Sequence, residues 1–247
     1  MLLPYLGKSM PRSVPSIQFR NGLLSRLTRE QIKPISPHLE RVALAAHKSL
    51  ETRDRKIEYA YFVEEGLVSV VANSRDGNTI EIGVIGREGM TGIALLMNVD
   101  RSPLDSLVQI TGSAHRISAE RLRDAMDKNP GVSRLLTSYA HVFTVQAAFT
   151  ALANGRHNVE ERLSRWLLMA HDRMDGDEIP LTHALLAVML GVRRPGVTVA
   201  INSLEHRGLI RSNRGAVGII DRKGLEVSAS GIYGRPESEY KRLLGQA

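Results

Sequence analysis

Residues 182–210 read THALLAVMLGVRRPGVTVAINSLEHRGLI and hold two short helical patterns on either side of one glycine. Thr182 is a candidate N-cap of the first helix, because its hydroxyl can accept a hydrogen bond from an early backbone N–H group. Gly191 can take the left-handed conformation that often ends a helix. Between them, apolar residues recur at helical spacing and predict a buried stripe: Leu185, Leu186, Met189 and Leu190.

A second helix is predicted to begin near Pro195, because proline suits the first turn of a helix, where its missing N–H group costs little. Arg194, Thr198 and Asn202 are each four residues apart and share the outward face. Two short helices joined by a glycine turn predict a helix-turn-helix. The inward face of the second helix is apolar: Val197, Ala200, Ile201 and Leu204.

The outward face of this second helix has the chemistry that reads base pairs. Arginine is the commonest reader of guanine, asparagine can form two hydrogen bonds to adenine, and a threonine methyl can touch the methyl of thymine. Arg193 and Arg194 lie at the amino end, the part of a recognition helix that usually reaches the bases. The alternative is an ordinary pair of amphipathic helices in a core, whose arginines carry no function.

The residues that follow, RSNRGAVGII at 211–220, favour DNA binding. Asn-Arg-Gly between two apolar segments predicts a tight hairpin. This hairpin would be the wing of a winged helix-turn-helix, with Arg211 and Arg214 against phosphates beside the recognition helix. Taken alone, these two arginines also fit a solvated turn. The candidate DNA-binding residues are therefore Thr182, Arg193, Arg194, Thr198, Asn202, Arg211 and Arg214.

The chain has 247 residues, enough for one large domain or two smaller ones. Its formal net charge of +7 favours a polyanionic partner. Residues 1–60 hold 11 Lys and Arg against 5 Asp and Glu, residues 61–155 hold 8 against 10, and residues 156–247 hold 14 against 11. Because the predicted DNA-binding part is only mildly basic, the DNA-binding prediction rests on where its arginines lie.

The sequence has no cysteine, which excludes disulfides, thiolate metal sites and cysteine-ligated iron–sulfur clusters. No continuous apolar run approaches the length that crosses a membrane. Residues 1–16, MLLPYLGKSMPRSVPS, are interrupted by prolines and lack the features of a signal peptide. We therefore expect a cytoplasmic protein without a membrane partner.

The chain divides into five segments by its patterns. Residues 1–20 are predicted to form a loose N-terminal arm. Residues 21–129 are predicted to form a sensor domain, with short helical pieces up to about residue 41 and short strands between about 42 and 118. Residues 130–155 are predicted as one long helix, residues 156–230 as the DNA-binding domain, and residues 231–247 as a polar tail that is partly frayed from 233 onward.

The strand region alternates apolar and polar residues between glycine-containing turns. Strands are predicted at 59–63, 67–71, 79–85, 107–110 and 114–117, with turns at 64–66 and 74–78. Short strands at such spacing suggest a small β-barrel or sandwich. Gly83, Gly86, Gly89 and Gly92 gather at one corner, where the backbone must bend tightly or approach a ligand.

The long helix carries a heptad-like series spaced alternately by four and three residues: Leu135, Tyr139, Val142, Gln146, Phe149 and Ala153. One interpretation is a dimer seam, with Gln146 fixing its register, because a DNA reader with one recognition helix gains affinity and specificity by pairing. The other is a helix packed on the barrel. A hinge is predicted at 155–158, and a closing helix at 224–229. A further helix over 159–174 is predicted from the stripe Leu163, Trp166, Leu167 and Ala170.

This order of a β-rich sensor, a long helix and a winged helix-turn-helix resembles the Crp/Fnr family of bacterial transcription regulators, which includes the cyclic-AMP receptor protein. The resemblance spans about residues 22–230 and is most specific at FVEEG (62–66), at the corner 86–92 and at 181–210. It implies an α+β fold: a cyclic-nucleotide-binding-like β-barrel (jelly roll), a long connecting and dimerisation helix, and a C-terminal winged helix-turn-helix domain. It also implies a homodimer that binds an inverted repeat in double-stranded DNA and contacts RNA polymerase.

The resemblance places Arg193 and Arg194 at the start of the family's recognition helix. Two nearby positions depart from the family pattern. Pro195 stands where many members have a base-contacting glutamate, and Val199 where many have a second basic residue. The family's usual DNA half-site is therefore not expected for this chain.

The sensor departs further from the family pattern. Cyclic-nucleotide-binding members follow the corner glycine with a glutamate that binds the ribose, but here Gly92 is followed by Ile93, which cannot accept a hydrogen bond. An Arg-Ser pair suited to a phosphate is retained as Arg101 and Ser102. Gly92, Arg101 and Ser102 are therefore candidates for an effector site, and its ligand is a cyclic nucleotide, another small molecule or none.

No cofactor or metal site is assigned from the sequence. A haem ligand among His38, His47 and His115 stays open, although single histidines are more often surface or hydrogen-bonded residues. We expect no enzyme, because no Walker-type loop, HExxH or Gly-x-Ser-x-Gly motif occurs. We expect a homodimeric transcription regulator of the Crp/Fnr type, whose long helix shifts between two arrangements. The alternative is a small-molecule-binding module whose helical domain docks onto a protein.

Overall fold

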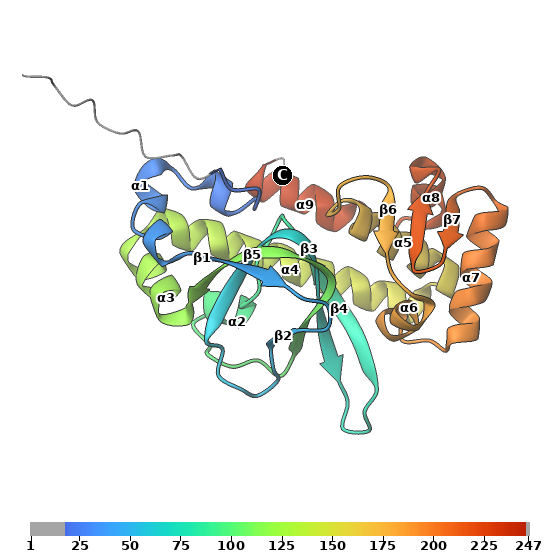
Figure 1. Ribbon diagram of the computed structural model, residues 1–247, viewed down its shortest axis with the longest axis horizontal. Coiled ribbons are helices and arrows are strands. Elements are labelled where there is room, and N and C mark those ends of the chain that lie inside the picture. The colour runs from blue at the N-terminus through green and yellow to red at the C-terminus, as the bar shows by residue number, and fades with distance from the viewer. Residues whose placement is uncertain (1–17, 246–247) are drawn as a thin grey trace, which may run out of the picture.

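The computed structural model describes residues 18–245, so the predicted N-terminal arm, residues 1–20, lies almost entirely outside the described residues. Figure 1 shows a strongly curved β-sheet, the long helix α4 running behind it, and a smaller domain of short helices and strands near the far end of that helix. The last helix, α9, returns along α4 toward the N-terminal segment. The predicted order of β-rich sensor, long helix and helical domain is confirmed.

Short helical pieces open the described chain: η1 (Leu24–Arg26), α1 (Arg29–Ile32) and η2 (Ser36–His38). Thr28 caps α1, and the side chains of Thr28 and Gln31 close a reciprocal capping box. Pro34 and Pro37 interrupt the helical pattern and keep these pieces short. The prediction of short helices over 21–41 is confirmed, except that the first strand already begins at Glu40.

Five strands form the main sheet: β1 (Glu40–Leu44), β2 (Ser49–Glu51), β3 (Tyr59–Asn73), β4 (Thr79–Ile85) and β5 (Asp105–Ser118). All pairs are antiparallel, the order is β1-β5-β3-β4, and β2 also pairs with β5. Strands β1 and β2 fall outside the predicted set, whereas β4 matches its prediction at both ends. The sheet encloses an apolar cluster that includes Leu44, Val63, Val68, Ile85 and Val108.

The predicted turn at 64–66 is wrong, because β3 runs through it without a break. The register between β3 and β5 shifts after Val63, Glu65 and Leu67, so the segment is a bulged bend within one strand. Gly66 has a φ of 89° there, and a side chain on Gly112 of β5 would collide with the carbonyl group of Glu65. The segments predicted as separate strands at 107–110 and 114–117 likewise belong to the single strand β5.

The glycine corner makes room for side chains of α4 (Pro130–Arg156). A Cβ atom on Gly83 would lie 2.8 Å from Gln146 Oε1, and one on Gly89 would collide with the ring of Tyr139. The close approach predicted for this corner is therefore made in part by the chain's own connecting helix.

Three helices follow the strands or lie between them. They are α2 (Ile93–Leu96), α3 (Ala119–Lys128) and α4, whose observed end differs by one residue from the prediction of 130–155. Asn129 caps α4 by accepting hydrogen bonds from the N–H groups of Gly131 and Val132, and Pro130 occupies the first turn. Local sequence thus determines where the long helix begins.

The predicted dimer seam on α4 is wrong, because most of its residues are buried within the chain. Tyr139, Val142, Gln146 and Ala153 are all buried. The side chain of Gln146 accepts a hydrogen bond from the N–H of Val84 at 2.6 Å and donates one to the carbonyl of Val84 at 3.2 Å. These bonds occupy backbone groups on the free edge of β4. The other interpretation of the heptad-like series, packing on the sensor, is correct.

A different face of α4 is uncovered, and we call it the free face: Thr144, Ala148, Ala151, Leu152 and Gly155, all exposed. Among the single helices of the described chain, α4 alone is long and apolar enough to cross a membrane, with a mean hydropathy of 1.2. The expectation that no segment approaches this length is therefore wrong for α4, because it considered only uninterrupted apolar runs. Only 33% of its most apolar window is buried. Core helices of soluble proteins pass the same test. Here most of the apolar window of α4 is not buried by the rest of the chain.

The helical domain holds α5 (Val159–His171), β6 (Glu178–Pro180), α6 (His183–Leu190), α7 (Arg194–His206), β7 (Ile210–Asn213), β8 (Ala216–Ile219) and α8 (Arg222–Ser228). Asn158 caps α5 directly after α4 ends, within the predicted hinge. The hairpin of β7 and β8 is confirmed and gains a third strand in the order β6-β8-β7. The predicted stripe of α5 is buried in full: Leu163, Trp166, Leu167 and Ala170.

The prediction of a partly frayed tail is wrong for the described residues, because α9 (Arg235–Leu244) is a regular, packed helix. Its Tyr240 and Leu244 are buried in the cluster that also contains Leu136 and Val142 of α4. The hydroxyl of Tyr240 donates to the carbonyl of Glu88 at 3.0 Å. The polar composition of this segment does not predict a packed helix, because only a few apolar residues make its contacts with the core.

The sensor and the helical domain share one hydrophobic cluster. A hydrogen bond reinforces it: Trp166 Nε1 of α5 donates to Glu81 Oε1 of β4 at 2.7 Å, and the hydroxyl of Ser69 donates to the other oxygen of this carboxyl. Burial raises the pKa of Glu81 to about 7, although both hydrogen bonds oppose that shift. Four sheet residues belong to the cluster of the helical domain: Leu67, Val71, Val84 and Ile110.

Candidate nucleic-acid interface

The chain bends by 107° between α6 and α7. The side chain of Thr182 accepts a hydrogen bond from the N–H of Leu185 at 3.2 Å, and Gly191 ends α6 with a left-handed φ of 60°. Arg162 of α5 donates to the carbonyl of Leu190, the last residue of α6, where a cation also suits the helix dipole. The predicted start and end of the first helix are confirmed.

Apolar side chains hold the two helices against the domain core. Leu185 is only half-buried, so the predicted stripe of α6 is one residue narrower than expected. The second helix begins at Arg194, one residue before the predicted Pro195, and Arg193 is its N-cap residue. The remaining inward residues are buried as predicted: Leu186, Met189, Leu190, Val197, Ala200, Ile201 and Leu204.

The outward face of α7 presents polar side chains to solvent. Arg193, Arg194 and Asn202 are exposed, and none of these side chains has a hydrogen-bond or ion-pair partner within residues 18–245. Thr198 differs, because it is half-buried and its hydroxyl lies 3.2 Å from the Arg194 carbonyl and 3.3 Å from His183 Nδ1. The hydroxyl of Thr198 is thus committed to the helix pair, whereas the other three side chains are free to bind a partner.

The wing lies beside this face. Gly215 has a φ of 82° in the turn between β7 and β8, as a tight hairpin requires. Glu205 of α7 accepts a hydrogen bond from the N–H of Ser212 at 2.8 Å, which connects the hairpin to α7. Arg211 and Arg214 are exposed and have no partner in the described part of the chain. The structure therefore places both wing arginines in the same domain surface as α7.

Two further residues belong to this surface. Val199 is 69% exposed, although it lies on a helix whose other valine is fully buried. An exposed valine on such a face can touch a thymine methyl. The signal was present in the sequence, because Val199 falls out of phase with the inward residues. The second is His183, which the sequence did not identify as a candidate DNA-binding residue. Its contact with the hydroxyl of Thr198 places it next to this face.

The candidate effector residues of the sensor make hydrogen bonds within the chain. The N–H of Gly92 donates to the carboxylate of Glu51 at 2.7 Å, and the hydroxyl of Ser106 donates to the same oxygen at 3.1 Å. Glu51 is buried, and burial raises its pKa. The exposed Arg101 reaches only the carbonyl of Asp54, at 3.4 Å. A carboxyl group of the chain itself thus accepts the hydrogen bond from the N–H of Gly92, one of the candidate effector residues.

The remaining candidate ligands are also separate. His38 and His47 are exposed, and Ser102 accepts a hydrogen bond from the N–H of Leu104 at 3.1 Å. His115 lies 3.1 Å from Glu64 and stacks edge-on against Phe19. Over residues 18–245 no group of three or more histidine, aspartate or glutamate side chains is arranged to hold a metal ion.

Comparison with known proteins agrees with this geometry. Residues 161–227 match the family of the Crp-like helix-turn-helix domain, a range that runs from α5 into α8. A transcriptional regulator named SdrP from Thermus thermophilus is 27% identical over 190 residues, which cover 74% of this chain and 88% of that protein.

Solved structures share the fold. FixK2 from Bradyrhizobium japonicum superposes with a TM-score of 0.67 at 20% identity, over 76% of this chain and 96% of that one. A transcriptional regulator of the Crp/Fnr family from Eubacterium rectale gives 0.66 at 19% identity, over 86% and 99%. Residues 161–227 thus match a Crp-like helix-turn-helix domain, and the chain as a whole is similar in sequence to a transcriptional regulator and shares the fold of Crp/Fnr structures.

Proposed function

We propose that this regulator binds double-stranded DNA sequence-specifically, as a homodimer on an inverted-repeat site. One observation carries the proposal: Arg193, Arg194 and Asn202 stand exposed on α7 with no partner in the described chain. Arginine and asparagine are the side chains that best distinguish guanine and adenine in the major groove. Arg211 and Arg214 on the wing would bind phosphates and set the register of the helix on the duplex.

The free face of α4 supports the dimer. It is an exposed strip of small and apolar residues on a helix whose most apolar window is only one-third buried. A second copy of the same face would cover it by symmetry. Such pairing would present two recognition helices to half-sites about one helical turn, or ~10 base pairs, apart.

Sedimentation of an Ala148→Glu variant tests the dimer. An unpaired carboxylate in a packed interface costs roughly 3–5 kcal/mol, so the variant should sediment as a monomer. Val227→Glu is the matched control, because Val227 is 78% exposed and lies on α8, outside the helix that carries the free face. A dimeric Ala148→Glu protein would show that the free face does not form the interface.

Selection of bound duplexes from a random pool tests the DNA-binding proposal. We expect enrichment of a two-fold symmetric motif. A protein that forms no saturable complex in the presence of competitor DNA would contradict the proposal. That outcome would favour the alternative, a ligand-binding module whose helical domain docks onto a protein.

The remaining parts of the proposal follow from the family. We propose a non-catalytic protein of the cytoplasm that contacts RNA polymerase at the promoter. Its regulation would act through two arrangements of α4 and the helical domain that change the spacing of the recognition helices.

A further inference from the structure

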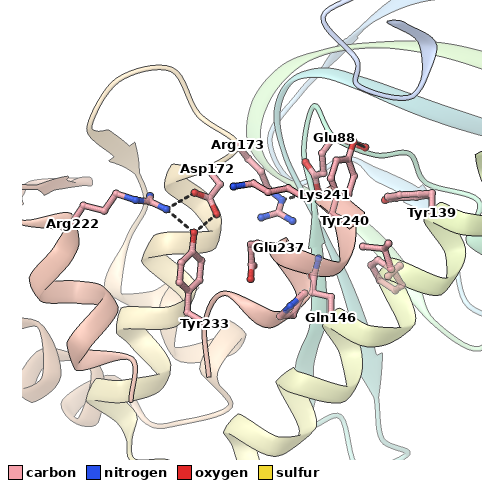
Figure 2. A pocket seen from close by; sticks show the side chains of 13 residues that line it. Glu88, Tyr139, Gln146, Asp172, Arg173, Arg222, Tyr233, Glu237, Tyr240 and Lys241 are labelled. Carbon is pink, nitrogen blue, oxygen red and sulfur yellow. Dashed lines mark hydrogen bonds and ion pairs between the residues drawn. The ribbon is translucent and has the colours of Figure 1, made fainter. Parts of the chain in front are cut away.

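A cavity of about 380 Å³ lies where all parts of the chain meet, and we call it the junction cavity. Figure 2 shows its walls: Glu88 from the sensor, Tyr139 and Gln146 from α4, and residues of α9. Asp172 and Arg173 directly after α5, Arg222 of α8 and Tyr233 between α8 and α9 complete them. Its volume falls within the range of small-ligand sites, roughly 300–1,000 Å³. It lies apart from the sensor corner at Gly92, which does not line it.

Most polar groups of the walls are already paired with one another. Arg173 Nε donates to Glu88 at 2.7 Å. Arg222 Nη2 donates to Asp172 at 2.7 Å and to the hydroxyl of Tyr233 at 2.6 Å, and this hydroxyl donates to the other oxygen of Asp172 at 2.8 Å. These charges balance in pairs, so they form the rigid walls of the cavity.

Three groups at the cavity retain binding capacity. Lys241 is exposed at its edge, and its ammonium has no partner within residues 18–245. Arg173 is buried and uses Nε and Nη1, the latter on the carbonyl of Met169, which leaves Nη2 without a protein partner in the described chain. Glu237 is the third, but one of its oxygens accepts the N–H of Gly234 at the start of α9, where the helix dipole favours a negative charge.

The balance of these groups favours an anion. The carboxylate of Glu237 is partly compensated by the start of α9, whereas the ammonium of Lys241 has no acidic partner within residues 18–245. Guanidinium and ammonium donors form the strong, charge-assisted hydrogen bonds that carboxylate and phosphate groups accept. The amide of Gln146 is already bonded to the backbone of Val84. The other lining includes aromatic and aliphatic side chains that would pack against an apolar body: Tyr139, Val142, Phe143 and Tyr240.

We propose that the junction cavity is an effector site for a small organic anion with an aromatic or apolar body, whose charged group is held by Lys241 and Arg173. This inference rests on the proposed function for its regulatory meaning. A ligand there would touch the sensor, α4, the helical domain and α9 together. It would therefore favour the one arrangement of these parts in which all four walls are in place.

Calorimetric titration of the full chain with benzoate tests the site, with benzamide as the neutral probe of the same shape. We expect saturable benzoate binding and at least about tenfold weaker binding of benzamide, since a hydrogen bond to a charged group contributes enough for such a factor. Equal affinity for both probes, or no saturable binding of benzoate at millimolar concentration, would overturn the proposal.

Two variants localise the probe. Lys241→Met should weaken benzoate binding about tenfold, whereas Lys223→Met, which removes another exposed charge, from α8, should leave it unchanged. Val142→Phe adds a ring to the wall and should weaken benzoate and benzamide alike, with folding checked by the melting temperature. An unchanged benzoate affinity in Lys241→Met would contradict the assignment.

The benzoate titration contains no DNA, so its result is independent of the DNA-binding test. The two proposals can therefore fail separately. Loss of benzoate binding with intact DNA binding would overturn the effector site alone. Benzoate binding by a protein that selects no duplex would overturn the proposed function and leave the site in place.

Discussion

The outward face of α7 and the corner of the sensor differ in whether their polar groups have hydrogen-bond partners within the chain. On α7, Arg193, Arg194 and Asn202 stand exposed with no partner in the described chain. At the sensor corner, the buried carboxyl group of Glu51 accepts the hydrogen bond from the N–H of Gly92. An exposed polar group without a protein partner is available to a ligand, whereas a buried one that is already hydrogen-bonded within the chain is not. The comparison indicates that the outward face of α7 is available to a partner, whereas the N–H group at the sensor corner is already used within the chain.

The largest effect is expected on α7. Arg193→Ala combined with Arg194→Ala should weaken specific DNA binding by roughly 2–6 kcal/mol, since each well-placed arginine contributes about 1–3 kcal/mol. Fluorescence anisotropy with a selected duplex measures the loss. Arg134→Ala serves as the control, because Arg134 is also exposed and without a partner in the described chain but lies on α4. Equal DNA affinities of the double variant and the control would show that these two arginines do not bind DNA.

The next effect concerns Glu81, where the sensor meets the helical domain. Its folded pKa of about 7 exceeds the ordinary value of 4.5, so the folded chain prefers the protonated carboxyl. The stability from this group is complete below pH 4.5 and is lost as pH rises through about 7. Glu81→Gln cannot titrate and should be more stable than the parent at mildly alkaline pH, by at most about 3 kcal/mol.

Urea unfolding at acidic and alkaline pH measures this difference. Glu120→Gln on the exposed surface of α3 is the control and should follow the parent at every pH. A Glu81→Gln protein that loses stability in parallel with the parent as pH rises would show that this carboxyl does not set the pH dependence.

A smaller effect is expected from the wing. Replacing Arg211 and Arg214 with alanine should lower affinity for all duplexes alike and reduce the salt dependence of binding by about one unit for each lost phosphate contact. Titrations at several salt concentrations measure the slope. A change of sequence preference without a change of slope would mean that these arginines read bases.

The smallest effect is expected at the sensor corner. Cyclic AMP should leave both the melting temperature and the DNA affinity unchanged, because Glu51 already occupies the N–H of Gly92. Differential scanning fluorimetry with increasing nucleotide measures the shift. A saturable rise in melting temperature would show that the sensor binds the nucleotide despite the hydrogen bond between Gly92 and Glu51.

Local signals made much of the fold predictable from sequence. Thr182, Gly191 and Pro195 mark the limits of two helices through capping and backbone conformation, which depend on neighbouring residues alone. The wing and the start of α4 followed from equally local turn and proline signals. The exposed arginines of α7 followed from helical periodicity, because the apolar residues fix which face is inward.

Long-range packing accounts for what the sequence did not show. The heptad-like series on α4 has the same pattern whether a second copy or the chain's own sheet covers it, and the partner of Gln146 is Val84, far away in sequence. The helix α9 is polar in composition, and only its contact with α4 makes it regular. Glu51 gave no signal at all, because nothing in its neighbourhood indicates that it reaches Gly92.

The most direct test of the open recognition face is to select duplexes in parallel with the parent chain and with Arg194→Ala. The account predicts that both enrich a symmetric site and that the variant loses its preference at one base pair in each half-site. The same motif with the same preference at every position from both proteins would contradict it.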